Sequence, residues 1–427
     1  MTSKINAITT GSGGIEVTGD SSGEIEFQAD GSTIATITSS GLSLTGTLPI
    51  ADGGTGQSTA SDARAALGLE IGTDVQSYDA NTAKYNDTTA NFTGTLQTSG
   101  NQVATQNALG VRNLIINGDM RIDQRNAGSS ITPANNEHCL DRYRNIITQS
   151  SKYSVQQVSD APSGFTSSLK VTSLSSYSIT SGDIFAIAQR IEGYNIAHLD
   201  WGTANAKTVT LSFWVKSSLT GTFGGAFRNE VPNRDYPFSY TINTANTWEK
   251  KTITIAGDTT GTWLTNNGIG IRLSFGFGVG ATYSGTAGVW ASSNIVSSTG
   301  ATSVVGTSGA TWQITGLQLE VGDTATPFEH RPYDMELARC QRYYEIGGFF
   351  HVGYVTGAIN LGSTVKFAVK KRASATLIQT STSASRTSST TQNASTGAQD
   401  ESFLSFRTGT SAGAAQYSEI WAASAEL

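Results

Sequence analysis

The sequence is poor in charge, in proline and in the residues that build most catalytic and metal sites. Only 14% of its 427 residues are charged, where about 25% is usual for a soluble domain. Two cysteines and four histidines, none at metal-ligand spacing, exclude a disulfide framework and give no sign of a metal site. The net charge is −6 and the basic residues are scattered, which argues against nucleic acid as a partner.

Long apolar runs and a secretory leader are also missing. No stretch of 18 or more apolar residues occurs, so no membrane insertion is expected. Residues Met1 to Asn6 lack the charged-then-apolar pattern of a signal peptide. We therefore expect synthesis in a cytoplasm, with release by lysis if the protein acts outside the cell. Cys139 and Cys340 read most simply as buried, reduced thiols, although the sequence leaves their pairing open.

The residues that are abundant favour strands. Hydrophobic residues make up 37% of the chain, too many for a disordered polymer, and threonine and aromatic residues prefer strands. Apolar and polar residues alternate in residues 209–215, 248–255, 269–277 and 312–319. Many short strands with no helical stretch between them predict an all-β fold containing a β-sandwich. Residues 292–311 fit either a loop or a hairpin.

The N-terminal residues predict a small β-structure. Residues 24–29 and 32–37 are rich in β-formers and flank Asp30-Gly31, a pair that suits a two-residue hairpin turn with positive φ. The apolar residues of 1–47 are too few to bury a core within one chain. We therefore expect three copies of the chain to pack together here.

A glycine-rich turn at Gly53, Gly54 and Gly56 leads into a short predicted helix. Ser58, Thr59 or Ser61 can cap this helix and Gly68 can end it. No lysine follows the glycines, so the segment is not a phosphate-binding loop.

The last hundred residues predict one helix and a further β-domain. The helix is expected from about Met335 to Tyr344, with Asp334 as its N-cap. The last strand is expected over residues 417–427. The Ser/Thr-rich stretch 379–400 is expected to form a mobile loop at the tip.

Two sets of motifs stand out, one within residues 46–69 and one within residues 112–344. The string Gly46-Thr-Leu-Pro-Ile-Ala-Asp-Gly-Gly-Thr-Gly, followed by Ala65-Ala-Leu-Gly-Leu69, resembles a connector of many phage tail-fibre proteins. A second set resembles, in order, the carbohydrate-binding-module-like jelly roll of phage fibre and virion proteins. Its segments are residues 112–119, 141–143, 212–216, 246–249, 316–322, 326–332 and 340–344.

The resemblance implies a modular phage tail fibre in the virion. It implies a virion-attachment region at residues 1–47, a connector and fibrous trimeric shaft at 48–110, and a jelly roll at 111–332. A linking helix and a smaller C-terminal β-domain follow at 333–427. The implied partners are two further copies of the chain (a homotrimer), tail adaptor or nozzle proteins at the N-terminus, and host-surface polysaccharide. The alternatives are a capsid-bound head fibre or decoration protein and a polysaccharide-degrading tailspike.

The sequence predicts neither a catalytic site nor a cofactor. Glu137, His138 and Cys139 are adjacent, but neighbours on a strand point to opposite faces. No pattern groups the two carboxylates that a glycosidase needs. We therefore expect a protein that binds and is not an enzyme.

The expected sugar-binding residues are aromatic and polar side chains in predicted loops. Flat rings suit the apolar faces of pyranoses, and amide, carboxylate and guanidinium groups suit their hydroxyls. These candidates are Trp201, Trp263, Arg228, Asn233, Arg234, Asp235 and Tyr236. The charged members also fit a solvated loop or a trimer interface. Trp214, Trp248 and Trp312 lie in predicted strands and are expected in the core.

Overall fold

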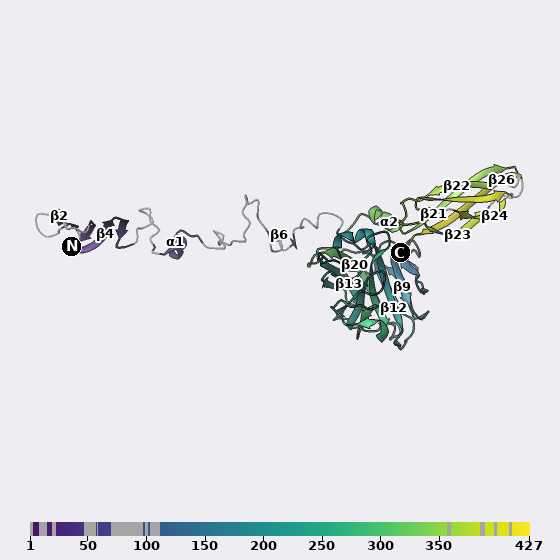
Figure 1. Cartoon of the computed structure of the whole chain (residues 1–427), viewed down its shortest axis with the longest axis horizontal. Coiled ribbons are helices and arrows are strands. Elements are labelled where there is room, and N and C mark those ends of the chain that lie inside the picture. Colours follow the sequence, from purple (N-terminus) through teal and green to yellow (C-terminus); the bar gives the residue numbers. More distant parts are fainter. Residues whose placement is uncertain are drawn as a thin grey trace. The chain divides into compact units, whose positions relative to one another are not determined.

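The computed structural model (Figure 1) consists mainly of strands. It describes residues 3–7, 15–18, 23–46, 57, 59–69, 97–98, 101–102, 112–356, 360–384, 389–396, 399–409 and 412–427. Two α-helices occur among these residues, and neither is long and apolar enough to cross a membrane. The chain divides into two compact units, residues 1–97 and 98–427.

The first unit holds a five-stranded sheet. Its strands follow the order β2 (Ile15–Thr18), β1 (Ser3–Ala7), β3 (Ile25–Ala29), β4 (Ser32–Thr38) and β5 (Gly41–Leu44). Asp30 and Gly31 join β3 to β4 with φ values of 47° and 76°, which confirms the predicted hairpin. Within residues 23–46, Ala35 is the one buried residue, so this sheet has almost no core of its own.

The predicted connector helix is α1 (Ala60–Ala66). The hydroxyl of Thr59 accepts a hydrogen bond from the backbone N–H of Asp62 at 3.1 Å, and Gly68 follows the helix with φ +68°. Thr59 is therefore the cap, and Ser61 lies inside the helix. Two short strands follow along the chain, β6 (Gln97–Thr98) and β7 (Asn101–Gln102).

The centre of the second unit is a β-sandwich, as predicted. One sheet has the order β10 (Tyr153–Val158), β11 (Ser168–Ser173), β20 (Thr311–Val321), β13 (Val209–Ser217) and β16 (Glu249–Ile255). The other sheet, called here the six-stranded sheet, has the order β15 (Asp235–Ile242), β14 (Gly221–Arg228), β17 (Ile269–Val279), β12 (Ile184–Glu192), β9 (Tyr143–Ile147) and β8 (His138–Leu140). The strands predicted at 209–215, 248–255, 269–277 and 312–319 correspond to β13, β16, β17 and β20.

Short elements complete the sandwich. The 3-10 helices are η3 (Gly193–Asn195), η4 (Ala197–Leu199) and η5 (Ala281–Tyr283). Residues 292–311 are mainly loop, with one short strand, β19 (Ser297–Ser298), parallel to β18 (Ser284–Gly285). Ile295 to Ser298 are buried, and the hydroxyl of Ser274 on β17 donates to the Val296 carbonyl at 2.9 Å. This loop therefore covers part of the outer face of the six-stranded sheet.

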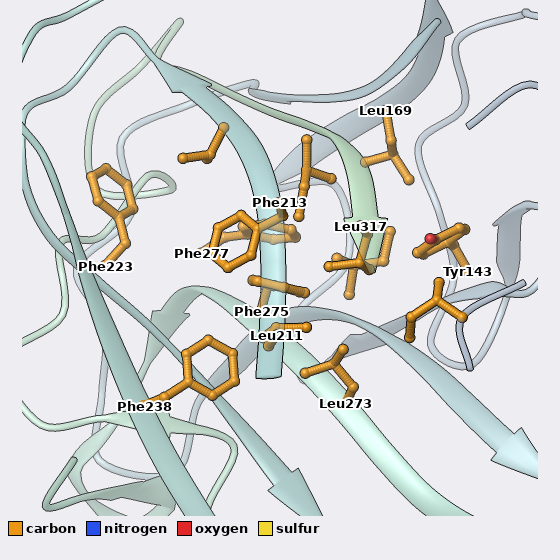
Figure 2. Packing of buried hydrophobic residues seen from close by; sticks show 14 of the residues in the cluster. Tyr143, Leu169, Leu211, Phe213, Phe223, Phe238, Leu273, Phe275, Phe277 and Leu317 are labelled. Carbon is orange, nitrogen blue, oxygen red and sulfur yellow. The ribbon is translucent and has the colours of Figure 1, made fainter. Parts of the chain in front are cut away.

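The sandwich core is lined by the inward side chains of both sheets (Figure 2). Phe213 of β13 meets Phe275 of β17 edge to face at 5.2 Å, and Trp312 is fully buried as predicted. Trp214 and Trp248 are only half-buried, contrary to expectation. Trp214 alternates with the inward Phe213 and therefore points outward. Trp248 precedes β16 and lies beside the Lys216 ammonium at 5.1 Å.

Two of the sequence motifs, at residues 112–119 and 326–332, have a structural role in this fold. Arg331 donates to the backbone carbonyl of Ile115 at 3.0 Å and to the carboxylate of Glu336 at 3.1 Å. A Cβ on Gly118 would lie 2.2 Å from the Leu317 carbonyl oxygen, so only glycine fits there. These buried contacts tie the segment before the first sandwich strand to the segment after the last one.

The linking helix is α2 (Tyr333–Gln341). Pro332 occupies the N-cap position without a side-chain hydrogen bond, and Asp334 lies in the first turn, so the expected Asp334 cap is wrong. Cys340 on this helix packs with Ile116, Ile122 and Tyr343. Both Cys139 and Cys340 are buried and free, as in the simpler of the two expectations.

Two three-stranded sheets form the C-terminal β-region. One has the order β21 (Tyr344–Val355), β26 (Gly413–Ser424) and β23 (Thr376–Ala384), and the other β22 (Asn360–Lys366), β25 (Ser402–Gly409) and β24 (Ser389–Thr396). The expected tip loop at 379–400 is therefore wrong where it overlaps β23 and β24, because pairing with β26 and β25 makes these polar segments strands. Residues 385–388 and 397–398 of that prediction lie outside the described residues.

Candidate functional site

The two tryptophans expected to bind sugar are packed inside the protein. Trp201 and Trp263 expose only 6% and 7% of their surface. They meet each other edge to face at 4.8 Å, and each meets Trp290, at 5.4 Å and 5.7 Å respectively. The indole N–H of Trp263 donates to Asp258 at 3.1 Å. Both lie in loops, and a third tryptophan, distant in the sequence, packs against them.

The turn between β14 and β15 contains the charged cluster that the sequence singled out. The side-chain oxygen of Asn229 accepts from the backbone N–H groups of Asn233 and Arg234 at 3.3 Å and 3.2 Å. Its amide nitrogen donates to Asn233 and to the Thr262 carbonyl at 2.8 Å and 3.1 Å. Asn233 is exposed. The turn is thus held in one conformation by a single asparagine.

Three of the predicted residues in this cluster are engaged within the protein. Arg234 forms a two-pronged ion pair with Asp258, at 2.9 Å and 2.5 Å, and this hydrogen bonding raises the pKa of Arg234. Asp235 accepts from the backbone N–H and hydroxyl of Ser293 at 3.0 Å and 2.8 Å. Tyr236 packs on Trp290 at 5.1 Å. Arg234, Asp235 and Tyr236 therefore anchor neighbouring loops.

Arg228, the remaining predicted residue, belongs to a different group of side chains. Across adjacent strands of the six-stranded sheet, Arg228 on β14 stands opposite Arg272 on β17, and Arg272 stands opposite Arg190 on β12. Arg144 on β9 stands opposite Ala188, two residues before Arg190 on the same face of β12. We call these four side chains the arginine row.

The arginine row lies on the outer face of the six-stranded sheet. Each of its members is next in sequence to a residue that packs in the sandwich core, and strand neighbours point to opposite faces. These core neighbours are Tyr143, Ile191, Phe227 and Leu273. In the sequence, each of these arginines occupies an outward, polar position of a different strand. That pattern becomes informative only when the register between the strands is known.

The row leaves hydrogen-bond donors unused. Arg272 pairs with Glu230 at 3.0 Å, Arg228 donates to the Asn294 side-chain oxygen, and Arg190 donates to a terminal carboxylate oxygen of Leu427. Among the described residues, the buried Nε atoms of Arg144, Arg228 and Arg272 have no hydrogen-bond partner. Buried donors are normally satisfied, but the buried Nε atoms of several arginines outside the row, among them Arg142 and Arg331, are unpaired as well. The row is therefore distinguished by four guanidinium groups gathered on one face.

Burial and nearby like charges lower the pKa values of three members of the row. Burial, together with the charges of Arg144 and Arg272, lowers the pKa of Arg190 to about 9. Burial and the charge of Arg272 lower the pKa of Arg228 to about 10, and burial and Arg272 also lower the pKa of Arg144. All these groups stay protonated at neutral pH, so like charges face each other across adjacent strands.

The Glu137-His138-Cys139 segment is poorly suited to catalysis. Burial raises the pKa of the Cys139 thiol to about 12, and reactive cysteines have a lowered pKa. In the part of the chain that the structure describes, no three His, Cys, Asp or Glu side chains are grouped to hold a metal ion.

Comparison with known proteins gives weak structural similarities only. No protein-family model and no curated protein matches the chain. A family 11 carbohydrate-binding module from Clostridium thermocellum, solved with a β-1,3-1,4-mixed-linked tetrasaccharide, is 12% identical with a TM-score of 0.23; the match covers 47% of this chain and 98% of that one. A xylan-binding domain from Paenibacillus barcinonensis is 10% identical, TM-score 0.22, covering 47% and 99%.

A phage protein is also among the similar structures. The enzymatically active domain of tailspike protein 4 from bacteriophage CBA120 is 15% identical with a TM-score of 0.25. The match covers 42% of this chain but only 19% of that one. Because all three TM-scores are below 0.5, we base the function on the geometry of the chain itself.

Proposed function

We propose that this protein is a phage tail fibre that binds a host-surface glycan through its C-terminal β-domains without cleaving it. In this proposal residues 1–47 attach to tail adaptor or nozzle proteins, residues 48–110 connect, and the protein is a homotrimer in the virion. The observation that carries glycan binding is the arginine row, because four guanidinium groups stand together on one sheet face.

Sugars are well matched to such a face. Their hydroxyl and carboxylate oxygens accept hydrogen bonds, and guanidinium groups present several donors in a fixed fork. Strands hold these side chains more rigidly than loops do, so little ordering is needed on binding. A shallow site of this kind binds weakly by itself, and three copies on one fibre raise the avidity.

Exposed apolar side chains support the trimer. In the N-terminal sheet Ile34 and Leu42 expose 52% and 64% of their surface. In the C-terminal region Phe350, Val352 and Tyr354 lie at alternate positions of β21 and are also largely exposed. Soluble monomers rarely expose apolar residues in such groups, and further copies of the chain would cover them.

Adsorption to host cells tests the binding proposal. Purified full-length protein should bind cells of the host strain and block adsorption of the phage. A variant with both Arg144→Gln and Arg272→Gln should bind at least tenfold less. Lys250→Gln, which removes an exposed charge from the outer face of β16, is the matched control and should bind normally. Equal binding by all three proteins would show that glycan recognition lies elsewhere.

Two measurements test the fibre itself. Light scattering should give three times the chain mass of 44.7 kDa, and a stable monomer would refute the trimer. Antibody labelling of intact virions should mark the tail, and labelling confined to the capsid would make the protein a head fibre. Release of oligosaccharide from host polysaccharide would make it a tailspike enzyme.

A further inference from the structure

Several arginines outside the arginine row pair with a carboxylate of the chain. Outside the row, Arg331 pairs with Glu336 at 3.1 Å, Arg234 with Asp258 at 2.5 Å and Arg342 with Glu192 at 2.7 Å. Arg142 in the same way holds Glu426. In each case a carboxylate of the chain balances the charge of a guanidinium that is at least partly buried.

The row has four guanidinium groups, and they meet the terminal carboxylate of Leu427, on Arg190, and one paired side-chain carboxylate. Glu230, on Arg272, is that partner. Asp235 is close enough to influence Arg228 electrostatically, but one of its oxygens is taken by Ser293 and the other is buried without a hydrogen bond. Glu426, which influences Arg144, is bound by Arg125 and Arg142 instead. Positive charge in the row therefore exceeds the carboxylates available to it.

Two members of the row, Arg144 and Arg228, pair with no carboxylate among the described residues. Arg144 forms neither a side-chain hydrogen bond nor an ion pair with the described residues. Arg228 is 6% exposed, and its Nε has no acceptor. Because adjacent strands are about 4.8 Å apart, a row across β14, β17, β12 and β9 is about 14 Å long. A ligand that satisfies all of it must be extended and must carry acceptors along its length.

We infer that the glycan bound by this face is acidic, an extended polysaccharide whose sugars carry oxyanions that take the place of the missing carboxylates. This inference rests on the proposed glycan binding and names its chemical class. A neutral sugar offers hydroxyl acceptors but leaves the charge unbalanced, whereas a carboxylate or sulfate supplies both an acceptor pair and the counter-charge. Both anions share the chemistry that the row requires, and the experiment separates them.

Binding to three defined polymers tests the inference on the full-length chain. Polygalacturonate supplies carboxylates, dextran sulfate supplies sulfates, and dextran is the neutral reference. At low ionic strength at least one acidic polymer should bind at least tenfold more tightly than dextran and should raise the unfolding temperature. Arg144→Gln and Arg272→Gln should each weaken that binding about tenfold, and Lys250→Gln should leave it unchanged. Salt should weaken binding to the wild type more than to either variant.

The unfolding temperatures of the variants, measured without a ligand, also test whether the charges of the row repel each other. Removing the charge of Arg144, which has no carboxylate partner among the described residues, should leave the unfolding temperature unchanged or raise it. Arg272→Gln also removes the partner of Glu230, so the unfolding temperature measured for each variant decides whether lost binding reflects unfolding. If neither acidic polymer binds more tightly than dextran, the acidic class is wrong, and adsorption to host cells shows whether glycan binding itself survives. Tight binding of an acidic polymer that the arginine variants do not affect would place the site elsewhere and overturn the inference.

Discussion

Strand β13 of the sandwich and strand β4 of the N-terminal sheet differ in whether their apolar side chains are covered. Both alternate apolar and polar residues. Val209, Leu211 and Phe213 on β13 are fully buried, because a second sheet covers them. Ile34 and Ile37 on β4 expose 52% and 40% of their surface. Alternation therefore says which side chains share a face, but a cover from elsewhere decides whether that face is a core.

The sandwich and the N-terminal sheet therefore differ in what stabilises them. The sandwich buries large aromatic side chains between its own sheets and can fold without a partner. The N-terminal sheet buries little, so in our proposal it depends on other copies of the chain. Substitutions should therefore act on folding in the sandwich and on assembly in the N-terminal sheet.

The largest effect is expected from truncating the sandwich core. Trp312→Ala removes a fully buried ring that contacts Phe275 and Phe277, and should lower the free energy of unfolding by about 3–5 kcal/mol. Leu42→Ala in the N-terminal sheet is the contrasting variant and should leave the sandwich transition unchanged while weakening assembly. Denaturant titration with light scattering separates the two effects. A Trp312→Ala loss below about 1 kcal/mol would mean that the sandwich does not rely on its own core.

A smaller loss is expected where the residues after β26 join the sandwich. The Glu426 carboxylate is held by Arg142 and by Arg125, the latter at 2.8 Å. Glu426→Gln leaves two guanidinium groups without their counter-charge and should cost about 3 kcal/mol in the free energy of unfolding. Glu401→Gln, at an exposed pair with Lys370, is the control and should have no measurable effect. Equal losses from both variants would show that the buried ion pair contributes no more to the free energy of unfolding than the exposed one.

Acid should weaken the same junction through His138. Burial is the main cause that lowers the pKa of His138 to about 3, against an ordinary value of 6.5. Between these values the unfolded chain binds a proton that the folded chain does not, so stability falls as the pH falls. From pH 6.5 to 4.5 the loss is about 2 kcal/mol. Urea titrations at pH 7, 5.5 and 4.5 should show it.

A second group extends this loss at lower pH. Burial opposes the charge of Glu426, but Arg142 and the other nearby cations lower its pKa from 4.5 to about 2. Stability from this carboxylate is complete above pH 4.5 and is lost as the pH falls towards 2. His138→Gln should flatten the slope above pH 4.5 and leave the loss below it. An unchanged slope in that variant would rule out His138 as the cause.

Features set by neighbours in the sequence were predictable. The Asp30-Gly31 hairpin and the cap of α1 depend on a few consecutive residues, and both occur as expected. The four main sandwich strands followed from alternation alone. The Asp334 cap failed because Pro332 starts α2 earlier, and the strands within 379–400 were missed because pairing partners, rather than composition, make them.

The candidate site was only partly predictable for the same reason. Arg228 was identified in a loop-like cluster, yet its neighbours in space are Arg272 and Arg190, which are brought beside it by strand register. Trp263 was predicted to contact sugar, but little of its ring is exposed, because Trp290 from a distant loop packs against it. Long-range pairing, which one sequence does not reveal, therefore decides both which arginines form the row and which tryptophans are hidden.

The smallest effect is expected in the connector, where no core is involved. Thr59→Ala removes the cap of α1, whose seven residues include none that is buried, and should cost that helix about 1 kcal/mol. Amide exchange at Ala63 to Leu67 should then be about fivefold faster, since 1.4 kcal/mol is about tenfold, with the sandwich transition unchanged. Ser61→Ala is the control, because Ser61 lies within the helix and alanine favours helices. Faster exchange in Ser61→Ala would mean that the cap lies at Ser61, and a shifted sandwich transition in Thr59→Ala would mean that the two units are coupled.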